Sequence, residues 1–364
     1  METVITYRRA LHRIPELGYE LPQTLAFVKT HLAALDCTVA LPSRSAITAF
    51  FDAGAKTALA FRADMDALPI EEKTSASYAS CHAGQMHACG HDGHTAILLA
   101  FADWLSAHKT ELKSNVLLIF QPAEEATGGA QSVCATGLLA AHNVRAAFGL
   151  HLWPGLPAGQ LATRPGPLMA RSCEVNVTVT GKSVHIAKAA EGADAAEAAA
   201  ALLLEAYRME RTELPADCLR LLKFGELHAG TVRNALAATA VLRGSLRAFY
   251  DADFEFLQRR LRELSETVPA QFGCTGSLHC TEGIPAVHND ETLTEQLFAM
   301  RPEMLRLTEP SMTAEDFSFY GKEVPAVFSF LGTGCSEPLH GDHFDFEEST
   351  LLAGVEFYKS LLAL

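Results

Sequence analysis

The 364-residue chain is poor in the features that mark secreted, membrane or nucleic-acid-binding proteins. Its nine cysteines are odd in number, scattered and without a C-x-x-C pair, so they are not a disulfide framework. No uncharged apolar run approaches the roughly 18 to 20 residues that cross a bilayer, and the N-terminus lacks the apolar stretch of a secretory signal. Only 29 basic residues oppose 43 acidic ones, and the net charge of -14 repels nucleic acid and anionic lipid surfaces. We therefore expect a cytoplasmic protein that binds neither nucleic acid nor membranes.

Several catalytic signatures are also missing. The chain has no H-E-x-x-H, no G-x-S-x-G and no complete G-x-G-x-x-G. Gly181-Lys182-Ser183 resembles the end of a phosphate-binding loop, but Asn176 stands where that loop needs its first glycine. These absences exclude the zincin, nucleophile-elbow, dinucleotide-binding and phosphate-loop classes on motif grounds.

Hydrophobic residues make up 49% of the chain, which is enough for two domains. Several short apolar runs are continuous rather than alternating, as in strands that are buried on both faces of a sheet. They are Thr57–Phe61, Asn115–Phe120, Ala146–Leu150 and Pro325–Leu331. Helix-like stretches occupy His94–His108 and Ser349–Leu362. This pattern predicts a layered α/β domain with a mostly parallel sheet.

A second domain is predicted for residues 172–282, inserted between two parts of the first, 1–171 and 283–364. Glu174–Thr180 alternates polar and apolar residues, as a half-exposed strand does. The elements expected after it are a helix at Ala193–Arg208, strands at Cys218–Phe224 and Ala238–Phe249, a helix at Asp251–Thr267 and a strand at Gly276–Cys280. The order β-α-β-β-α-β predicts a small α+β domain with two helices on one face of an open sheet.

The densest group of reactive side chains is the segment MHACGHDGH, residues 86–94. It contains His87, Cys89, His91 and His94, together with Asp92 and two glycines that let the backbone bend. Imidazole and thiolate are good ligands for zinc-like ions, so this density indicates a metal site. A loop with helix-capping histidines is the alternative.

Other candidate residues follow the predicted strands. Glu124 and Glu125 come after Asn115–Phe120, and a ligand beside a general base is one use of such a pair. The pair is also typical of a solvated helix start. The remaining candidates are Asp64, Asp66, His151 and His340. Because sites in open α/β sheets gather at the carboxyl ends of strands, we expect these segments to meet at one edge, although each histidine alone is more often structural.

The chain resembles the metal-dependent amidohydrolases of the aminoacylase and carboxypeptidase group, and its motifs occur in the same order as in that family. That group includes hippurate hydrolase, indole-acetyl-amino-acid hydrolases and N-acetyldiaminopimelate deacetylase. The segments that carry the resemblance are LHRIPELGYE, FRADMDALPIEEKT, MHACGHDGHTA, FQPAEE, GLHLWP, GTVRN, GSLRAF, MTAEDFSFY and PLHGDHFDF. The resemblance implies a catalytic domain with two divalent metal ions and a smaller lid domain through which such enzymes often form homodimers.

The resemblance also implies roles for individual residues. The metal ligands would be Cys89, His91, Glu125, His151 and His340. Glu124 would be the catalytic base. Asp66 would be a supporting acidic residue, and Asp64 replaces a histidine that related peptidases use, so neither is assigned as a ligand. The mixed sulfur, nitrogen and oxygen donors admit zinc, manganese, cobalt or nickel.

The resemblance also implies roles for three residues of the lid, although the sequence around them supports these roles less strongly. His185 in GKSVH would stabilise the developing oxyanion, and Asn234 and Arg247 would lie near the substrate's carboxylate. A turn asparagine and a strand-edge arginine are the structural alternatives for the last two. The segment after His185 departs from the family pattern. His343 is a second departure, an alternative ligand or a substrate contact.

The expected reaction is hydrolysis of the amide bond of a small N-acyl amino acid by an activated water, with Glu124 as base. Two alternatives are a dipeptidase or carboxypeptidase with the same dinuclear centre and a non-catalytic metal-binding protein. The adjacent glutamates argue against the latter, because a binding protein has no chemical need for a base. The sequence does not distinguish the acyl group, the amino acid or the metal.

Overall fold

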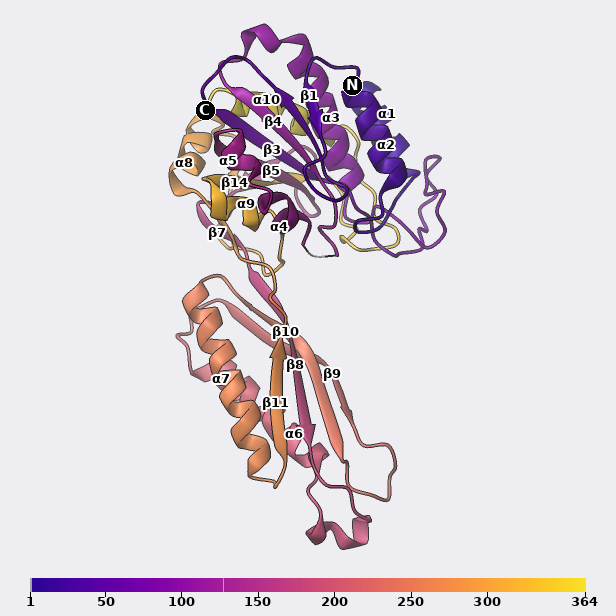
Figure 1. Ribbon diagram of the computed structural model, residues 1–364, viewed down its shortest axis with the longest axis vertical. Coiled ribbons are helices and arrows are strands. Elements are labelled where there is room, and N and C mark those ends of the chain that lie inside the picture. Colours follow the sequence, from indigo (N-terminus) through magenta and orange to yellow (C-terminus); the bar gives the residue numbers. More distant parts are fainter. Residues whose placement is uncertain (1, 127) are drawn as a thin grey trace. The chain divides into compact units, whose positions relative to one another are not determined.

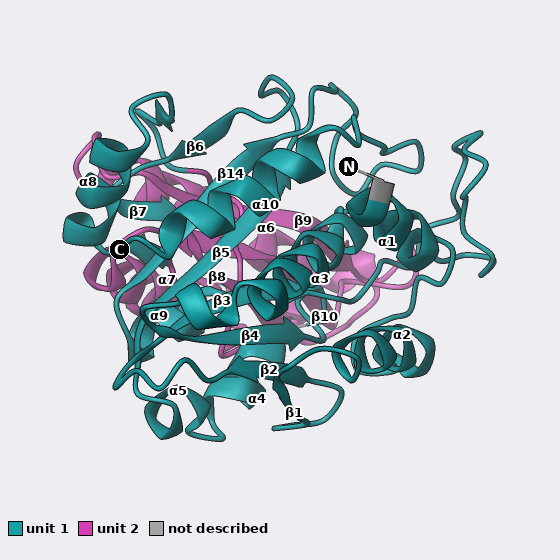
Figure 2. Ribbon diagram, turned by 90° about the horizontal axis from the view of Figure 1, so that it is seen from above, with its two compact units in different colours: residues 1–168, 287–310, 316–364 teal, residues 169–286, 311–315 magenta. Residues whose placement is uncertain are grey.

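The computed structural model describes residues 2–126 and 128–364, and the chain divides into two compact units. Unit 1 contains the chain up to Leu168, Val287–Pro310 and Asp316–Leu364. Unit 2 contains Met169–Ala286 and Ser311–Glu315 (Figure 2). In the described part, no helix is long and apolar enough to span a bilayer.

Unit 1 is built on an eight-stranded sheet with the order β1-β2-β4-β3-β5-β14-β6-β13 (Figure 1). Its strands are β1 (Thr38–Ala40), β2 (Ile47–Phe51), β3 (Ala58–Asp64), β4 (Asn115–Gln121), β5 (Val144–Trp153), β6 (Leu161–Thr163), β13 (Leu305–Arg306) and β14 (Ala326–Gly332). Strands β4, β3, β5 and β14 are parallel neighbours, whereas β1, β2 and β6 pair with antiparallel partners. β7 (Gly166–Met169) and β12 (Val287–Asn289) form a separate two-stranded sheet. The predicted mostly parallel sheet is confirmed.

The central strands are buried along their whole length. Every residue of β3, β4 and β14 is buried. Most of these residues are apolar, as in strands covered on both faces, and the charged pair of β3, Arg62 and Asp64, is hydrogen-bonded internally. The helices that pack around this sheet are α1 (Glu2–His12), α2 (Pro22–Leu32), α3 (His91–Ala107), α4 (Gly129–Cys134), α5 (Leu138–Ala141), α8 (Glu291–Met300), α9 (Ser318–Glu323) and α10 (Thr350–Leu361), with a 3-10 turn, η1 (Lys109–Glu111). α3 packs against both α1 and α10. The layered α/β prediction therefore holds.

Helix α3 begins three residues earlier than the sequence predicts. Gly90 precedes it with φ +83°, a left-handed conformation that side chains disfavour, and a Cβ there would lie 2.9 Å from Leu152 Cδ1. His91 and His94 consequently lie three residues apart in the first turn of the helix rather than in a loop. The beginning of α3 thus supplies side chains to the site.

Unit 2 is an antiparallel four-stranded sheet, ordered β11-β8-β10-β9, against which α6 and α7 pack. Its elements are β8 (Arg171–Thr180), η2 (Ile186–Glu191), α6 (Ala195–Thr212), β9 (Arg220–Ala229), β10 (Thr239–Ala248), α7 (Asp251–Ala270) and β11 (Thr275–Cys280). Alternate residues of β8 from Cys173 to Val179 are buried, which confirms the predicted half-exposed strand. The observed strand and helix order also confirms β-α-β-β-α-β.

Candidate metal centre

Side chains from several elements of unit 1 meet where the parallel strands end. Asp64 is the last residue of β3, Glu124 and Glu125 follow β4, and His151 lies near the end of β5. His91 comes from the first turn of α3. This convergence follows from the topology, because parallel strands present their carboxyl ends at one edge of a sheet.

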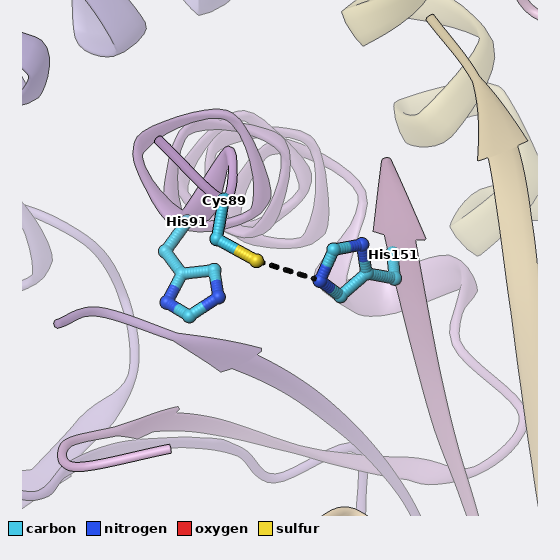
Figure 3. A group of neighbouring side chains, drawn as sticks. All are labelled: Cys89, His91 and His151. Carbon is cyan, nitrogen blue, oxygen red and sulfur yellow. Dashed lines mark hydrogen bonds between the residues drawn. The ribbon is translucent and has the colours of Figure 1, made fainter. Parts of the chain in front are cut away.

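Cys89, His91 and His151 form the first group of donors (Figure 3). One donor atom from each lies within 4.8 Å of the others, and all three residues are buried. The distance between Cys89 Sγ and His151 Nε2 is 3.4 Å. A soft sulfur beside two ring nitrogens is a donor set that suits a transition-metal ion.

Backbone carbonyls orient both histidines of this group. His91 Nδ1 lies 2.8 Å from the carbonyl oxygen of Asp66, and His151 Nδ1 lies 2.7 Å from that of Leu152. Each ring therefore donates from Nδ1 and turns Nε2 toward Cys89, which is the usual arrangement of metal-binding histidines. Among the described residues, His91 Nε2 has no hydrogen-bond partner although it is fully buried. A bound cation would satisfy that atom.

Cys89, Glu125 and His340 form the second group of donors, again within 4.8 Å of one another. Glu125 Oε1 lies 3.1 Å from His340 Nε2 and 3.9 Å from His91 Nε2. Cys89 therefore belongs to both groups. The two groups together contain all five residues that the family resemblance implies as metal ligands.

The turn that carries Glu124 and Glu125 is held by Asp66. Its two carboxylate oxygens accept hydrogen bonds from consecutive backbone amides, Glu124 N at 2.9 Å and Glu125 N at 3.1 Å. Ala123 before them has φ +55°, a left-handed conformation that is uncommon outside glycine. His340 has φ +63°, and its amide donates to Ala88 O at 2.8 Å. Unusual backbone geometry thus places both segments at the site.

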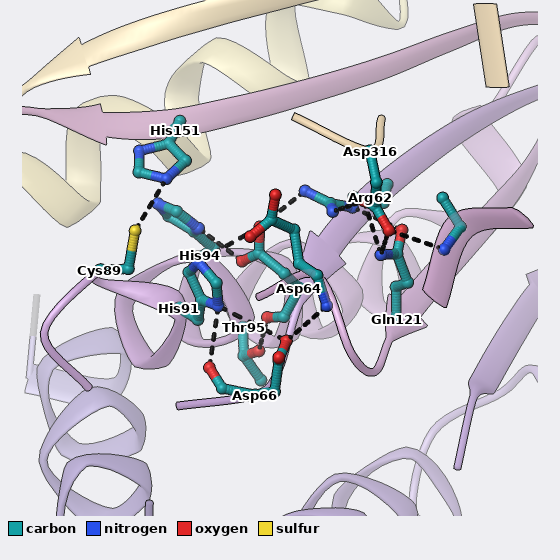
Figure 4. Close-up of polar contacts among 12 residues, drawn as sticks. Arg62, Asp64, Asp66, Cys89, His91, His94, Thr95, Gln121, His151 and Asp316 are labelled. Carbon is teal, nitrogen blue, oxygen red and sulfur yellow. Dashed lines mark hydrogen bonds and ion pairs between the residues drawn. The ribbon is translucent and has the colours of Figure 1, made fainter. Parts of the chain in front are cut away.

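A buried polar network lies directly behind the donors (Figure 4). Asp64 Oδ1 lies 2.6 Å from His94 Nδ1, and His94 Nε2 accepts the backbone N–H of Leu152 at 2.9 Å. The second contact fixes the neutral ring as the Nδ1–H tautomer, because Nε2 must accept. The His94 ring packs at 4.6 Å from the ring of His151. Asp64 and His94 thus position the strand that carries His151.

The same network extends to residues that the sequence did not single out. Arg62 donates to Asp64 at 2.6 Å and to Asp316 at 2.7 Å, and Gln121 also donates to Asp316. All of these side chains are buried. A fully buried arginine requires such partners, but only the fold shows which carboxylates provide them.

Burial and neighbouring charges shift the pKa values of the donor groups. Burial alone would lower the pKa of His91, but the carboxylates of Asp64, Asp66 and Glu125 raise it to about 10. Burial, with the charges of Glu125 and Glu124, raises the pKa of the Cys89 thiol. Burial lowers the pKa of His151 to about 3. A divalent cation reverses these preferences, because it stabilises the thiolate and the neutral imidazoles that bind it.

Two histidines near the site lie outside the donor groups. His87 is fully buried, but none of the groups in the described part of the chain contains it, and its ring lies 6.3 Å from that of His12. His343 is exposed, and its Nδ1 lies 2.7 Å from Asp342 Oδ1. Of the four nitrogen and sulfur candidates in residues 86–94, only Cys89 and His91 share a group with His151.

The three remaining candidates belong to unit 2. His185 and Asn234 lie close together, because Ile186 N donates to Asn234 O and His185 pairs with Ala235. His185 is exposed and precedes the short helix η2. Arg247 lies on β10, where it is half-buried and donates to Met312 O at 2.6 Å. The unusual segment after His185 is an exposed stretch of 3-10 structure, Ile186–Glu191, that is kinked at Lys188, where φ and ψ are not helical.

The sequence matches Peptidase family M20/M25/M40 over residues 60–364. The chain belongs to this family. Its members' hydrolytic chemistry accounts for the donors and the paired glutamates, so the protein is a metal-dependent hydrolase that acts on amide bonds. The resemblance seen in the motifs is thereby confirmed.

Two curated relatives cover nearly the full length of the chain. N-acetyldiaminopimelate deacetylase of Shouchella clausii is 32% identical and covers 100% of this chain, with 98% of that protein matched. An uncharacterized hydrolase of Staphylococcus saprophyticus is 31% identical, with 100% of this chain and 97% of that protein matched. The similarity thus extends across both units.

A solved structure is also similar over nearly the whole chain. It is a Bacillus subtilis protein described as a dinuclear metal-binding peptidase from the M20 family. The TM-score is 0.86 at 29% identity, with 99% of this chain and 96% of that chain covered. The predicted fold, an α/β domain with an inserted smaller domain, agrees with this likeness.

Proposed function

We propose that the protein hydrolyses the amide bond of small N-acyl amino acids, in the manner of an aminoacylase or deacetylase. The observation that carries the proposal is the position of Glu124. It comes directly before the donor residue Glu125, and one of its carboxylate oxygens lies within 4.8 Å of donor atoms of His91 and Glu125. The N-acetyldiaminopimelate deacetylase at 32% identity supports an acylated amino acid as the substrate class.

Two divalent metal ions fit the donors. Cys89, His91 and His151 would hold one ion, and Cys89, Glu125 and His340 would hold the other. The orphaned Nε2 of His91 and the carbonyl-oriented rings support this assignment. Zinc, manganese, cobalt and nickel all suit such mixed donors. When bound, the pair supplies Lewis acidity that polarises the amide carbonyl and lowers the pKa of water.

Glu124 performs the proton transfers in this proposal. Its carboxylate takes a proton from the attacking water and later delivers it to the leaving amine nitrogen, so one group acts first as base and then as acid. Asp66 fixes the direction of Glu124 by accepting the amide hydrogens of residues 124 and 125. This positioning lowers the entropy cost of orienting the carboxylate for the reaction.

Residues 1–171 and 283–364 are proposed as the catalytic domain and residues 172–282 as the lid. These ranges differ from units 1 and 2 by a few residues at each boundary and by Ser311–Glu315, which belongs to unit 2. His185 is proposed to stabilise the oxyanion, and Asn234 and Arg247 to bind the substrate's carboxylate. Homodimerisation through unit 2 is proposed from the family resemblance, and location in the cytoplasm from the cysteine pattern.

A dipeptidase or carboxypeptidase activity is the second candidate. The Bacillus subtilis protein described as a peptidase, at 29% identity, favours it. Both reactions use the same donors and the same base, and they differ only in the walls that receive the acyl group. Side-by-side assays of N-acyl amino acids and dipeptides distinguish them.

The assignment of Glu124 is tested by Glu124→Gln in the metal-loaded protein. We expect the variant to keep its bound metal and to lose hydrolysis by about 100-fold or more, because the amide cannot accept a proton. Glu111→Gln, the same change at an exposed position, is the matched control and should be neutral. Near-normal turnover by Glu124→Gln would remove Glu124 from the mechanism, whereas loss of metal would instead assign it as a ligand.

A further inference from the structure

His340 lies in a long irregular segment of unit 1, residues 333–349, which connects β14 to α10 without a helix or a strand. Connections of this length are uncommon inside compact domains, and ordered ones usually serve a function. His340 has a left-handed backbone conformation, and its side chain is 52% exposed. Together with Cys89 and Glu125 it is proposed to hold one ion, which we call the second ion. The hydrogen bonding of a helix or strand does not fix this proposed ligand.

The Arg8 side chain of α1 ties the irregular segment to the start of α3. It is buried, and it donates from Nε to Asp92 Oδ2 at 2.9 Å and from Nη2 to Asp345 Oδ1 at 2.7 Å. Its Nη1 donates to Glu348 Oε1 at 3.3 Å. Asp92 belongs to the first turn of α3, whereas Asp345 and Glu348 belong to the irregular segment. One cation therefore bridges α3 and the segment that carries His340.

Two aromatic rings hold the guanidinium in place. Arg8 Cζ lies 4.7 Å from the ring centroid of Tyr78 and 4.4 Å from that of Phe346, which is itself buried. The Tyr78 hydroxyl also donates to Asp345 Oδ2 at 2.9 Å, so both oxygens of this carboxylate accept hydrogen bonds. A planar guanidinium stacks on rings and donates in several fixed directions, which an ammonium group does not do. Lysine at this position would therefore not reproduce the bridge.

The start of α3 has supports that do not involve Arg8. Asp92 Oδ2 also lies 2.8 Å from His12 Nδ1, and His91 Nδ1 lies 2.8 Å from the carbonyl oxygen of Asp66. The helix itself packs against α10. The loss of Arg8 should consequently leave the first turn of α3 in place.

The irregular segment depends more strongly on Arg8. Its ion pairs with Arg9 and Lys73 are made by exposed side chains, and such pairs contribute little to stability. Backbone hydrogen bonds donated by His340 N and Lys73 N also join it to its neighbours. The buried bridge to Arg8 is thus its main charged contact with the rest of unit 1.

We propose that Arg8 is a positioning residue that holds His340 at the metal centre and thereby determines the affinity for the second ion. The proposal rests on the two ions of the proposed function. Without the bridge, the irregular segment would move more freely, and His340 would spend less time beside the other donors. The ion held by Cys89, His91 and His151 would keep all its ligands, because the irregular segment supplies none of them.

Competition between the zinc-loaded, full-length protein and a chromophoric chelator tests the proposal. It measures the affinity of each binding step, and His340→Ala identifies the step that belongs to the second ion. We expect Arg8→Lys to weaken that step by about 10-fold or more and to leave the other step within about twofold. Arg13→Lys is the matched control, because this exposed arginine contacts Ser77 and Cys81 instead of the irregular segment.

A milder variant separates positioning from misfolding. Tyr78→Phe keeps the ring beside Arg8 and removes only the hydroxyl that donates to Asp345. It should weaken the same binding step by about threefold, in keeping with the loss of one hydrogen bond. Tyr7→Phe removes a hydroxyl that donates to Asp103 on α3, and it should change neither step. Equal weakening of both steps by Arg8→Lys, or of neither, would overturn the proposal.

Hydrogen–deuterium exchange tests the bridge independently of the metal assignment. With and without zinc, peptides from residues 333–349 should exchange faster in Arg8→Lys than in the wild-type protein, whereas peptides from α10 should not. Unchanged exchange of residues 333–349 would overturn the proposal even if two ions bind. A single zinc-binding step in the wild-type protein would instead contradict the two ions of the proposed function, and the link between Arg8 and the second ion would fall with them.

Discussion

The proposed metal centre depends most on Cys89. Among the described residues, one donor group contains His151 and another contains His340, and Cys89 is the only residue that belongs to both of these groups. The loop before α3 holds it inside the protein, where burial and two glutamates oppose its ionisation. A thiol in such surroundings is a poor nucleophile and a good ligand once a cation is present.

His12 shows how charge at a single buried residue sets the dependence of stability on pH. Its Nδ1 lies 2.8 Å from Asp92 Oδ2, and its Nε2 lies 3.4 Å from Glu72 Oε1. Burial alone would lower its pKa, but these carboxylates raise it to about 9. The charged and titratable groups that face it are Arg8, Glu72, Tyr78, His87 and Asp92.

The stabilisation from His12 should be complete below pH 6.5 and should disappear as pH rises through about 9, because the folded pKa lies above the unfolded value. We expect His12→Gln to reduce the free energy of unfolding at pH 7 and this difference to shrink by pH 10. Urea unfolding of both metal-loaded proteins from pH 7 to 10 measures it. The exposed His228→Gln is the control, and a difference independent of pH would contradict the account.

At the scale of elements, α3 and β5 are joined through His94. The ring accepts the amide hydrogen of Leu152, whose carbonyl oxygen in turn orients His151. Asp64 at the end of β3 holds the other ring nitrogen. Three elements are therefore fixed by one buried side chain, and the position of a proposed ligand depends on all of them.

Replacing His94 should therefore weaken metal binding without removing any proposed ligand. We expect His94→Phe to lower metal affinity by roughly 10- to 100-fold. Competition with a chromophoric chelator measures the affinity, and the cobalt(II) spectrum reports the geometry of the donors. His108→Phe, the same change beyond the far end of α3, is the matched control. Equal affinities in both variants would show that His94 does not position His151.

The sequence predicted the elements whose own residues determine them. Apolar runs identified β3, β4, β5 and β14. The rule that sites gather at the carboxyl ends of strands predicted that Glu125, His151 and His340 lie close together, as they do in the structure. The network of Arg62, Asp64 and Asp316 was missed, because its members meet only when segments 254 residues apart pack together. The start of α3 at His91 was also missed. A glycine such as Gly90 is typical of a loop, and the sequence does not show that its left-handed φ allows the helix to begin directly after it.

At the scale of the whole molecule, unit 2 offers a surface for the proposed dimer. β9 is at the edge of its sheet, and its residues from Gly225 to Ala229 are largely exposed, with Leu227 at 45% exposure. An unpaired strand edge of this kind pairs readily with another chain. The second copy of the protein is the occupant that the family resemblance implies.

Sedimentation velocity tests this arrangement. The wild-type protein should sediment as a dimer, and Leu227→Lys should shift it toward monomer, because a charge at the strand edge opposes pairing. Leu204→Lys replaces a leucine that is 68% exposed on α6, and it should leave the dimer intact. A wild-type monomer, or a dimer that Leu227→Lys does not weaken, would exclude pairing through β9.

The most direct measurement of the central claim is amine release by protein that has been stripped of metal and reloaded with zinc, manganese, cobalt or nickel. The substrates are N-acetyl and N-benzoyl amino acids beside dipeptides. The account predicts no turnover by the stripped protein and metal-restored cleavage of N-acyl amino acids. Cleavage of dipeptides alone would replace the aminoacylase proposal with the peptidase one. Absence of turnover with two bound metal ions would contradict the proposed reaction.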